Sequence, residues 1–279
     1  MKQALLEKVY ALLRWPEDLE SPEGMKRFDE SYRDFKNLLR HPWISELVSR
    51  KRVRVLDVCS GKGVGGLALA KALKEANVDV DLTFIDLRKR ALDNAVSYAR
   101  KLLGIEARGI ECSATEVHRL GLRADIALVH GLSTPHFDPY QMVRLCAALA
   151  KVVEPSGIAI IEEFDRVYGL LCRAGCKEVT IERASEEEIV VTISAGYDVR
   201  RGVFRRIVMN LLTGDRAPLD VRLWDVASVA ATLWMFFRDV DLITTSSALR
   251  GFIVAKDPRG IDPESYAKLP TVARSQGRA

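Results

Sequence analysis

The sequence lacks the closely spaced cysteine pairs that bind zinc or that form the disulfide framework of a secreted domain. It has 5 cysteines in 279 residues, and none of them forms a CxxC pair. They are Cys59, Cys112, Cys146, Cys172 and Cys176. Zinc sites and disulfide frameworks both leave recurrent cysteine spacings. We therefore expect no metal site and no disulfide framework.

Long apolar runs are missing as well. The longest uncharged run, Val226 to Phe237, is too short to cross a bilayer, which takes about 20 apolar residues in a helix. The N-terminal stretch carries Glu7 inside an amphipathic pattern, where a signal peptide would have an apolar segment. These absences predict a cytoplasmic protein that does not contact a membrane.

Neither sign of charge dominates. The chain has 42 Lys and Arg against 38 Asp and Glu, a net charge of +4, and both signs occur throughout. The total charge therefore implies no polyanionic partner. Asn and Gln are scarce whereas Arg and Glu are plentiful, a bias typical of thermophilic proteins. Hydrophobic residues make up 48% of the chain, enough for one large globular domain or two.

The most informative stretch that is present runs from Val53 to Gly66 and reads VRVLDVCSGKGVGG. An apolar strand pattern ends at Asp57, a glycine-rich turn follows, and a helix pattern begins near Val64. A turn without side chains lets a ligand touch the main chain, and the N-terminus of a helix attracts carboxylate or phosphate groups. This stretch therefore predicts a nucleotide-like binding site.

Two nucleotide-binding patterns can be compared with this stretch. The phosphate loop GxxxxGK[ST] does not match, because Lys62 is followed by glycine. The dinucleotide fingerprint GxGxxG matches Gly61, Gly63 and Gly66, and Asp86 follows at the distance of a ribose-binding acid. An NAD(P)-dependent oxidoreductase is therefore an alternative.

The segment DVCSGKG also resembles motif I of the class I S-adenosylmethionine-dependent methyltransferases, an acid followed by x, G, x, G, x, G. Asp57, Gly61 and Gly63 match this motif, and Cys59 stands where the first glycine is usual. The residues between Asp57 and Gly61 favour this family, because a dinucleotide fingerprint opens directly out of its strand.

The resemblance implies S-adenosylmethionine as cofactor and an α/β fold with a doubly wound, mostly parallel seven-stranded sheet. Asp86 would accept the ribose hydroxyls, Leu87 would cover the adenine, and Ser113 stands where the family usually has an acid. The cofactor-binding residues that it implies are Asp57, Cys59, Ser60, Gly61, Gly63, Asp86, Leu87, Ser113, Ala114, Thr115, His130 and Gly131.

Apolar periodicity divides the chain into five parts. Three of them are a cofactor-binding core over residues 51–164, a closing helix with the last two strands over 224–256, and a polar tail over 257–279. An antiparallel final pair of strands would separate the methyltransferase family from nicotinamide enzymes. Residues 1–50 form a helical layer, or a lid that places Tyr32, Phe35 and Trp43 over a ligand.

The fifth part, residues 165–223, is a β-rich insert after the fifth strand that we expect to be too small for its own core. In the family, material at this point commonly shapes the acceptor pocket, whereas a dimer contact is the alternative role. Four aromatic residues are candidates for lining such a pocket: Tyr168, Tyr197, Phe204 and Trp224. Four arginines could hold an anionic or RNA acceptor: Arg200, Arg201, Arg205 and Arg206.

Methyl transfer from a sulfonium releases a neutral sulfide, so alignment of the reactants matters more than acid catalysis. A general base is required only if the acceptor must lose a proton. His136 lies in the loop after the fourth strand, where acceptors of the family bind, and is our candidate for base or acceptor contact. Together with Tyr168 it forms the predicted substrate-binding set.

The leading hypothesis is an S-adenosylmethionine-dependent methyltransferase acting on a small molecule, with RNA or protein as alternative acceptors and a homodimer as an open question. Besides the oxidoreductase, a non-catalytic nucleotide-binding module is a further alternative. It is suggested by the two departures from the family motifs, at Cys59 and Ser113.

Overall fold

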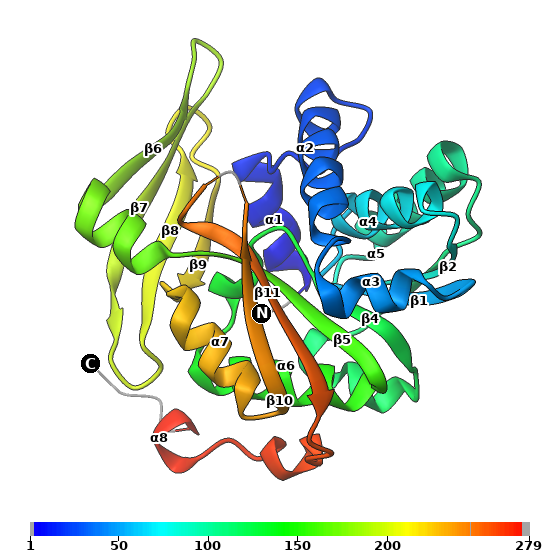
Figure 1. The fold of residues 1–279 in the computed structure, drawn as a ribbon. Coiled ribbons are helices and arrows are strands. Elements are labelled where there is room, and N and C mark those ends of the chain that lie inside the picture. The colour runs from blue at the N-terminus through cyan, green and yellow to red at the C-terminus, as the bar shows by residue number, and fades with distance from the viewer. Residues whose placement is uncertain (1–2, 246, 275–279) are drawn as a thin grey trace.

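The computed structural model describes residues 3–245 and 247–274. A seven-stranded sheet in the order β10-β11-β5-β4-β1-β2-β3 forms its centre (Figure 1). The strands are β1 (Arg52–Val58), β2 (Asp79–Asp86), β3 (Arg108–Glu111), β4 (Ala124–Val129), β5 (Val153–Phe164), β10 (Phe237–Thr244) and β11 (Arg250–Pro258). Neighbours among β1 to β5 are parallel, whereas β11 lies antiparallel between β5 and β10. The predicted doubly wound, mostly parallel seven-stranded sheet is thus confirmed, and the structure adds that its final pair of strands is antiparallel.

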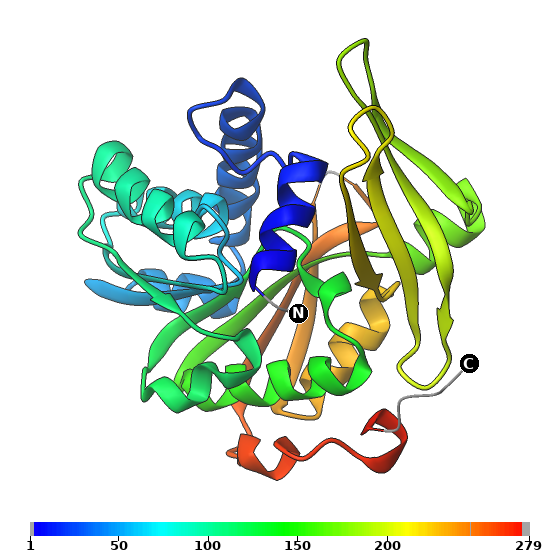
Figure 2. The same ribbon diagram turned by 180° about the vertical axis from the view of Figure 1, so that it is seen from behind.

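Helices cover both faces of this sheet (Figures 1 and 2). One face carries α2 (Pro22–Leu38), α3 (Pro42–Val48), α4 (Val64–Glu75) and α5 (Lys89–Tyr98), and the other carries α6 (Pro139–Val152) and α7 (Val226–Trp234). In β1, Val53 and Val55 point into the first core, whereas Leu56 and Val58 point into the second. This alternation explains why the strand reads as a continuous apolar run, since it is buried on both faces.

Two helices begin where their sequence signals predict. Ser21 caps α2 by accepting the N–H of Gly24 at 3.0 Å. Asp138 caps α6, where Pro139 takes the first helical position and the Gln141 side chain completes a capping box. Both caps satisfy N–H groups that have no partner within the helix.

The predicted helix over residues 87–103 differs from the structure at both ends. Asp86 accepts the N–H of Arg88 at 2.9 Å and keeps Arg88 extended, so α5 begins only at Lys89. The last turn, Ala99–Leu103, is π-helical and ends at Gly104 with a φ of 61°. The helix predicted over residues 224–237 is likewise shorter, because it is capped by Asp225.

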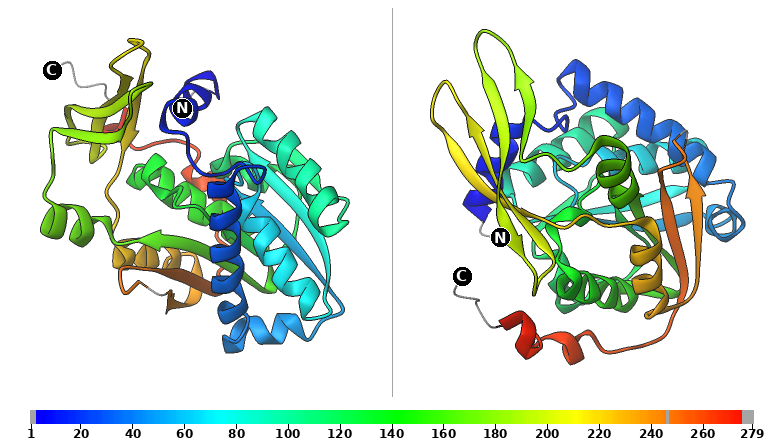
Figure 3. Two further views of the ribbon diagram at one scale, coloured as in Figure 1. Left: turned by 90° about the horizontal axis from the view of Figure 1, so that it is seen from above. Right: turned by 90° about the vertical axis from the view of Figure 1, so that its left-hand side faces the viewer.

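The insert forms a second, antiparallel sheet of four strands in the order β6-β7-β8-β9. Its strands are β6 (Val179–Ala184), β7 (Ile189–Asp198), β8 (Val203–Asn210) and β9 (Arg216–Val221), and a π-helical segment, Val167–Ala174, precedes them. The first helix, α1 (Gln3–Leu13), packs Val9 against Val190 and Val208 of this sheet (Figures 2 and 3). The insert sheet therefore contributes to a small hydrophobic cluster that α1, from outside the insert, completes.

The three aromatic residues of the predicted lid pack into the first face instead. Phe35 is fully buried and stacks on Phe252, with ring centroids 5.1 Å apart. The Tyr32 hydroxyl donates to Glu75 of α4, and Trp43 lies under the Lys256 ammonium. These residues form a packing layer, and the lid role does not apply to them.

After β11 the chain runs along the outside of the second face. It forms two short helical segments, Pro263–Tyr266 and Thr271–Arg274. The rings of Tyr266 and Phe236 pack edge to face with their centroids 5.6 Å apart, and Glu264 forms an ion pair with Arg119. Within the described residues, no helix is both long and apolar enough to span a membrane.

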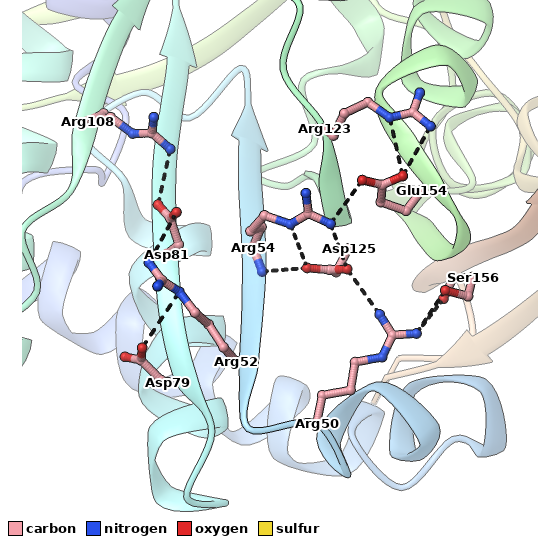
Figure 4. A network of polar contacts seen from close by, with 10 residues as sticks. All are labelled: Arg50, Arg52, Arg54, Asp79, Asp81, Arg108, Arg123, Asp125, Glu154 and Ser156. Atoms are coloured by element: carbon pink, nitrogen blue, oxygen red, sulfur yellow. Dashed lines mark hydrogen bonds and ion pairs between the residues drawn. The ribbon is translucent and has the colours of Figure 1, made fainter.

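The edge of the sheet opposite the glycine-rich turn is tied together by a network of ion pairs around Asp125 (Figure 4). Its carboxylate accepts the Arg54 N–H at 2.8 Å and the Arg54 Nε–H at 3.0 Å, and Arg50 donates at 3.0 Å. Glu154 extends the network by pairing with Arg54 and Arg123. Burial raises the pKa of Asp125, but the hydrogen bonds from Arg54 outweigh this effect and the net pKa is lowered. Asp125 therefore holds β1 and β4 together as a carboxylate.

Replacing Asp125 with asparagine should lower the free energy of unfolding by about 2 kcal/mol at neutral pH, because Arg50 loses its anionic partner and Arg54 keeps only Glu154. Chemical denaturation measures this change. Glu106→Gln is the matched control, because it breaks the exposed Arg100–Glu106 pair, which water and salt screen, and should change the free energy of unfolding much less. Equal effects of the two substitutions would contradict the structural role of Asp125.

Candidate active site

The turn between β1 and α4 is fixed by a carboxylate and by left-handed backbone. Asp57 Oδ2 accepts the N–H of Gly66 at 2.8 Å, and a Cβ at Gly66 would lie 2.6 Å from that oxygen. Cys59 has a φ of 60°, a conformation that favours glycine and costs another residue about 1 kcal/mol. The turn thus keeps the conformation that the usual glycine would give, although cysteine replaces it.

The second oxygen of Asp57, Oδ1, is buried and has no hydrogen-bond partner. Burial raises the pKa of Asp57 to about 7; the Gly66 N–H lowers it and the nearby Asp86 carboxylate raises it further. A cationic group beside Oδ1 would satisfy this oxygen and stabilise the carboxylate.

Asp86 lies at the end of the neighbouring strand and also holds the turn. Its Oδ2 accepts the Gly61 N–H at 2.8 Å, and its Oδ1 accepts the backbone N–H and Nε–H of Arg88 at 2.9 and 3.3 Å. The parallel register of β1 with β2 pairs Val58 with Ile85, so the two acids end at the same edge of the sheet. This is the juxtaposition that the sequence predicts.

Two pockets lie along this edge. The first, here called the inner pocket, measures ≈ 110 Å³, and its walls include Cys59, Asp86, Leu87, Ser113, Ala114, Thr115, His136 and Tyr10. The second, the turn pocket, measures ≈ 20 Å³, and its walls include Asp57, Cys59, Ser60, Gly61, His130, Gly131, Glu17 and Arg27. All predicted cofactor residues except Gly63 line one or both pockets.

Gly63 serves the fold instead. It precedes the first residue of α4 with a φ of 86°, and its Cα faces Phe84 and Ala95, which a Cβ would approach to within 3.0 and 2.9 Å. Its place in the motif is explained by close packing of the turn against β2 and α5.

Four residues that the sequence analysis missed complete these walls. Tyr10 of α1 places its ring against the Arg88 guanidinium, 3.9 Å away, and Glu17 pairs with the same guanidinium at 2.7 Å. Arg27 of α2 donates to the Pro16 carbonyl at 3.1 Å, and its Nη2 lies 2.6 Å from where a Gly131 Cβ would be. No local pattern marks these residues, because the partners lie far apart in the sequence.

A buried cluster supports the turn pocket from behind. Glu162 of β5 is fully buried, pairs with Arg250, accepts the Gly131 N–H at 2.7 Å and lies 3.4 Å from His130 Nε2. Despite burial, the Arg250 guanidinium and the Gly131 N–H lower the pKa of Glu162. Burial lowers the pKa of His130 to about 4, so this imidazole is neutral at physiological pH. Its ring packs against Gly65, where a Cβ would come within 2.5 Å.

His136 lines the inner pocket. Its Nε2 is 3.5 Å from the Tyr10 hydroxyl, and its Nδ1 is buried without a hydrogen-bond partner. Burial, together with Arg88 and Arg166, lowers the pKa of His136 to about 4, which makes it a neutral but weak base. His136 does not line the large cavity that adjoins the turn pocket.

A third cavity, here called the charged cavity, measures ≈ 1030 Å³ and adjoins the turn pocket through Tyr10, Trp15, Glu17, Arg27 and Arg88. Its walls come from α1, α2, the segment between them, the sheet edge and the insert. They are mostly ionisable and include Glu7, Lys26, Glu30, Lys62, Glu162, Arg183 and Arg250.

The structure does not bring the four aromatic candidates of the insert to this cavity. Tyr168 is 53% exposed on the π-helical segment, and Tyr197 is exposed as well. Phe204 lines a separate cavity of ≈ 450 Å³, and Trp224 is buried and donates to the Phe137 carbonyl at 3.0 Å. The insert reaches the charged cavity through Arg183.

Comparison with known proteins agrees with this geometry. Residues 55–157 match the family model described as "Methyltransferase domain". No curated protein matches the chain.

Three solved structures illustrate the fold similarity. An S-adenosylmethionine-dependent methyltransferase from Clostridium acetobutylicum is 12% identical with a TM-score of 0.61, and the alignment covers 81% of this chain and 91% of that one. The sugar N-methyltransferase KedS8 from Streptoalloteichus is 17% identical with a TM-score of 0.56, covering 83% and 88%. CalS10, an amino pentose methyltransferase from Micromonospora echinaspora solved with bound S-adenosylmethionine, is 16% identical with a TM-score of 0.52, covering 83% and 91%. At these identities the similarity concerns the fold.

Proposed function

We propose that the protein transfers a methyl group from S-adenosylmethionine to a polar small molecule. Residues 55–157 match the model of a methyltransferase domain, and the fold resembles that of a solved S-adenosylmethionine-dependent methyltransferase, which supports this proposal. The observation that carries this proposal is the meeting of Asp57, Asp86 and the Gly61 turn at one edge of a sheet with an antiparallel β11.

The residues at this edge fit the proposed cofactor. Buried polar atoms without a hydrogen-bond partner occur on both pocket walls, namely Asp57 Oδ1, His130 Nε2 and His136 Nδ1. Asp86 would accept the ribose hydroxyls, and Leu87 with Ser113, Ala114 and Thr115 would enclose the adenine.

The amino-acid end of the cofactor carries one positive and one negative group. Asp57 would face the ammonium group, because its Oδ1 is unsatisfied and a cation stabilises the buried carboxylate. Arg27 would bind the carboxylate, because its guanidinium lines the turn pocket beside Gly131, where it donates to the Pro16 carbonyl and lies over the Trp15 ring.

When bound, this cofactor would supply a methyl group carried by a positively charged sulfonium. Transfer of the methyl group leaves a neutral sulfide. The residues of this chain then need to orient the acceptor and exclude water. Tyr10 and Trp15 line both the turn pocket and the charged cavity, so they stand where the two reactants would meet. His136 stays a candidate for acceptor contact or proton removal; its neutral imidazole can accept a proton, although its low pKa limits it as a base.

The charged cavity supports a polar acceptor with ionised groups. An apolar acceptor would have to desolvate Glu162, Arg27 and Lys62 without replacing their hydrogen bonds, which is unfavourable. The solved relatives KedS8 and CalS10 act on sugars, which agrees with a small polar acceptor.

An RNA acceptor is less well supported. Arg201 pairs with Asp138, Arg205 pairs with Asp198, and Arg206 donates to the Lys177 carbonyl. These guanidinium groups are engaged within the protein and would have to break these contacts to bind phosphate.

Calorimetric titration tests the cofactor. Heat is expected with S-adenosylmethionine and none with NAD or NADP, and the opposite result would favour an oxidoreductase. Tritium in the methyl group then identifies the acceptor, and we expect label in the low-molecular-mass fraction of a cell extract, not in its RNA or protein. Binding of S-adenosylmethionine without label in any fraction would indicate a non-catalytic module.

A further inference from the structure

The segment Arg14 to Ser21, here called the strap, connects α1 to α2 and crosses the glycine-rich turn. Glu17 in the strap forms a bidentate pair with Arg88, with Oε1 at 2.7 Å from Nη1 and Oε2 at 2.8 Å from Nη2. The side chains are only 12% and 4% exposed. Such a pair is well shielded from water and salt.

This pair lies directly on the turn. A Cβ at Gly61 would come within 2.5 Å of Glu17 Oε2 and 2.9 Å of Arg88 Nη2, and Tyr10 stacks on the far side of the guanidinium. Tyr10 and Arg88 line both the inner pocket and the turn pocket. These side chains therefore stand between the two halves of one crevice.

The divided crevice is too small for a nucleoside with an amino-acid tail. Its halves measure ≈ 110 and ≈ 20 Å³, whereas pockets for ligands of this size usually measure about 300–1,000 Å³. The strap must move before a ligand can extend from Asp57 to Ser113.

The contacts of the strap suit such a movement. It is held to the sheet edge by polar side-chain contacts, since Asp18 pairs with Lys62 at 2.6 Å and accepts the Tyr98 hydroxyl at 2.7 Å. The apolar contacts of α1 are made with the insert sheet instead, and Arg183 of that sheet donates to the Leu13 carbonyl at 2.6 Å. Leu19 of the strap is only 5% exposed and belongs to the first core, so it fixes the end of the strap near α2, whereas residues 14–18 can open without exposing that core.

We propose that the strap is an autoinhibitory latch, in which the Glu17–Arg88 pair closes the crevice and must part before S-adenosylmethionine enters. This inference rests on the proposed function for the identity of the ligand, whereas the latch itself is a property of the chain alone. Arg88, once released from Glu17, keeps its bond to Asp86 and can swing away from Gly61.

The test compares Glu17→Gln with Glu20→Gln. Glutamine at position 17 removes the charge that attracts Arg88, whereas Glu20 pairs with Lys101 at the exposed end of the strap and lines neither pocket. Stopped-flow fluorescence of Trp15, within the strap, should show a roughly tenfold faster association of S-adenosylmethionine for Glu17→Gln. Glu20→Gln should associate at the rate of the natural chain.

Hydrogen exchange of the strap, measured without cofactor, provides a second readout. Faster exchange over residues 14–21 in Glu17→Gln, but not in Glu20→Gln, supports the latch. An unchanged association rate, or loss of binding in Glu17→Gln, would overturn it, because Glu17 would then be irrelevant or a ligand. If the natural chain binds no S-adenosylmethionine, the proposed function fails, and unchanged strap exchange in Glu17→Gln would then reject the latch as well.

Discussion

An Asp86→Ala variant is expected to lose at least about 100-fold in affinity for S-adenosylmethionine. The carboxylate holds the Gly61 N–H and Arg88 in place and, in our proposal, also accepts the ribose hydroxyls. Hydrogen bonds to a charged group contribute about 1.5–3 kcal/mol each, so two of them account for this loss. Calorimetric titration measures the change.

A matched pair of ligands separates the two ends of the crevice. Methylthioadenosine has the nucleoside but not the amino-acid tail, so Asp86→Ala should weaken both ligands. Arg27→Gln should lower the affinity for S-adenosylmethionine about tenfold and leave the affinity for methylthioadenosine nearly unchanged. The reason is that Arg27 lines the turn pocket and not the inner pocket. Asp86→Ala with undiminished affinity for both would contradict the assignment of the crevice.

His130 and His136 together should lower the free energy of unfolding by about 4 kcal/mol between pH 7 and pH 5. Buried Asp57, whose pKa is raised to about 7, should offset about 2 kcal/mol of this loss, because the folded chain binds a proton there that the unfolded chain releases. Burial lowers the pKa values of His130 and His136 from 6.5 to about 4. Below pH 6.5 the unfolded chain binds two protons that the folded chain excludes, so stability decreases as the pH falls. Each histidine contributes about 2 kcal/mol over this interval.

Glu162 acts in the same direction at lower pH. Its pKa in the folded chain is lowered from an ordinary value of 4.5, so its contribution is lost as the pH falls below about 4.5. Denaturant titrations at a series of pH values test both effects. His130→Gln and His136→Gln should each reduce the loss between pH 7 and pH 5 by about 2 kcal/mol, and the double variant should become more stable as the pH falls, because the effect of Asp57 then remains. A loss of stability between pH 7 and pH 5 that survives in the double variant would show that other groups cause it.

Much of the fold follows from local patterns in the sequence. Apolar runs such as Val53 to Val58 identify buried strands, and capping residues such as Asp138 identify the starts of helices. These signals are readable because each depends on neighbours only a few residues away. Asp57 and Asp86 could be placed at one edge of the sheet because parallel strands connected by a helix end on the same side.

The tertiary structure decided which distant residues share the site. Glu17 and Arg88 are separated by 71 positions, and no periodicity connects them. Only packing brings α1 over the crevice, because the insert sheet needs Val9 to complete its core. The same packing gives the charged cavity its ionisable walls, in place of the aromatic lining that the sequence predicts for an acceptor pocket.

The sequence by itself therefore determined the succession of strands and helices along the chain, the glycine-rich turn and the acids at the strand ends. The tertiary structure decided the strap, the division of the crevice and the charge of the cavity. The physical reason is that secondary structure and turns are governed by short-range backbone geometry, whereas the contacts between segments depend on how complete surfaces fit together.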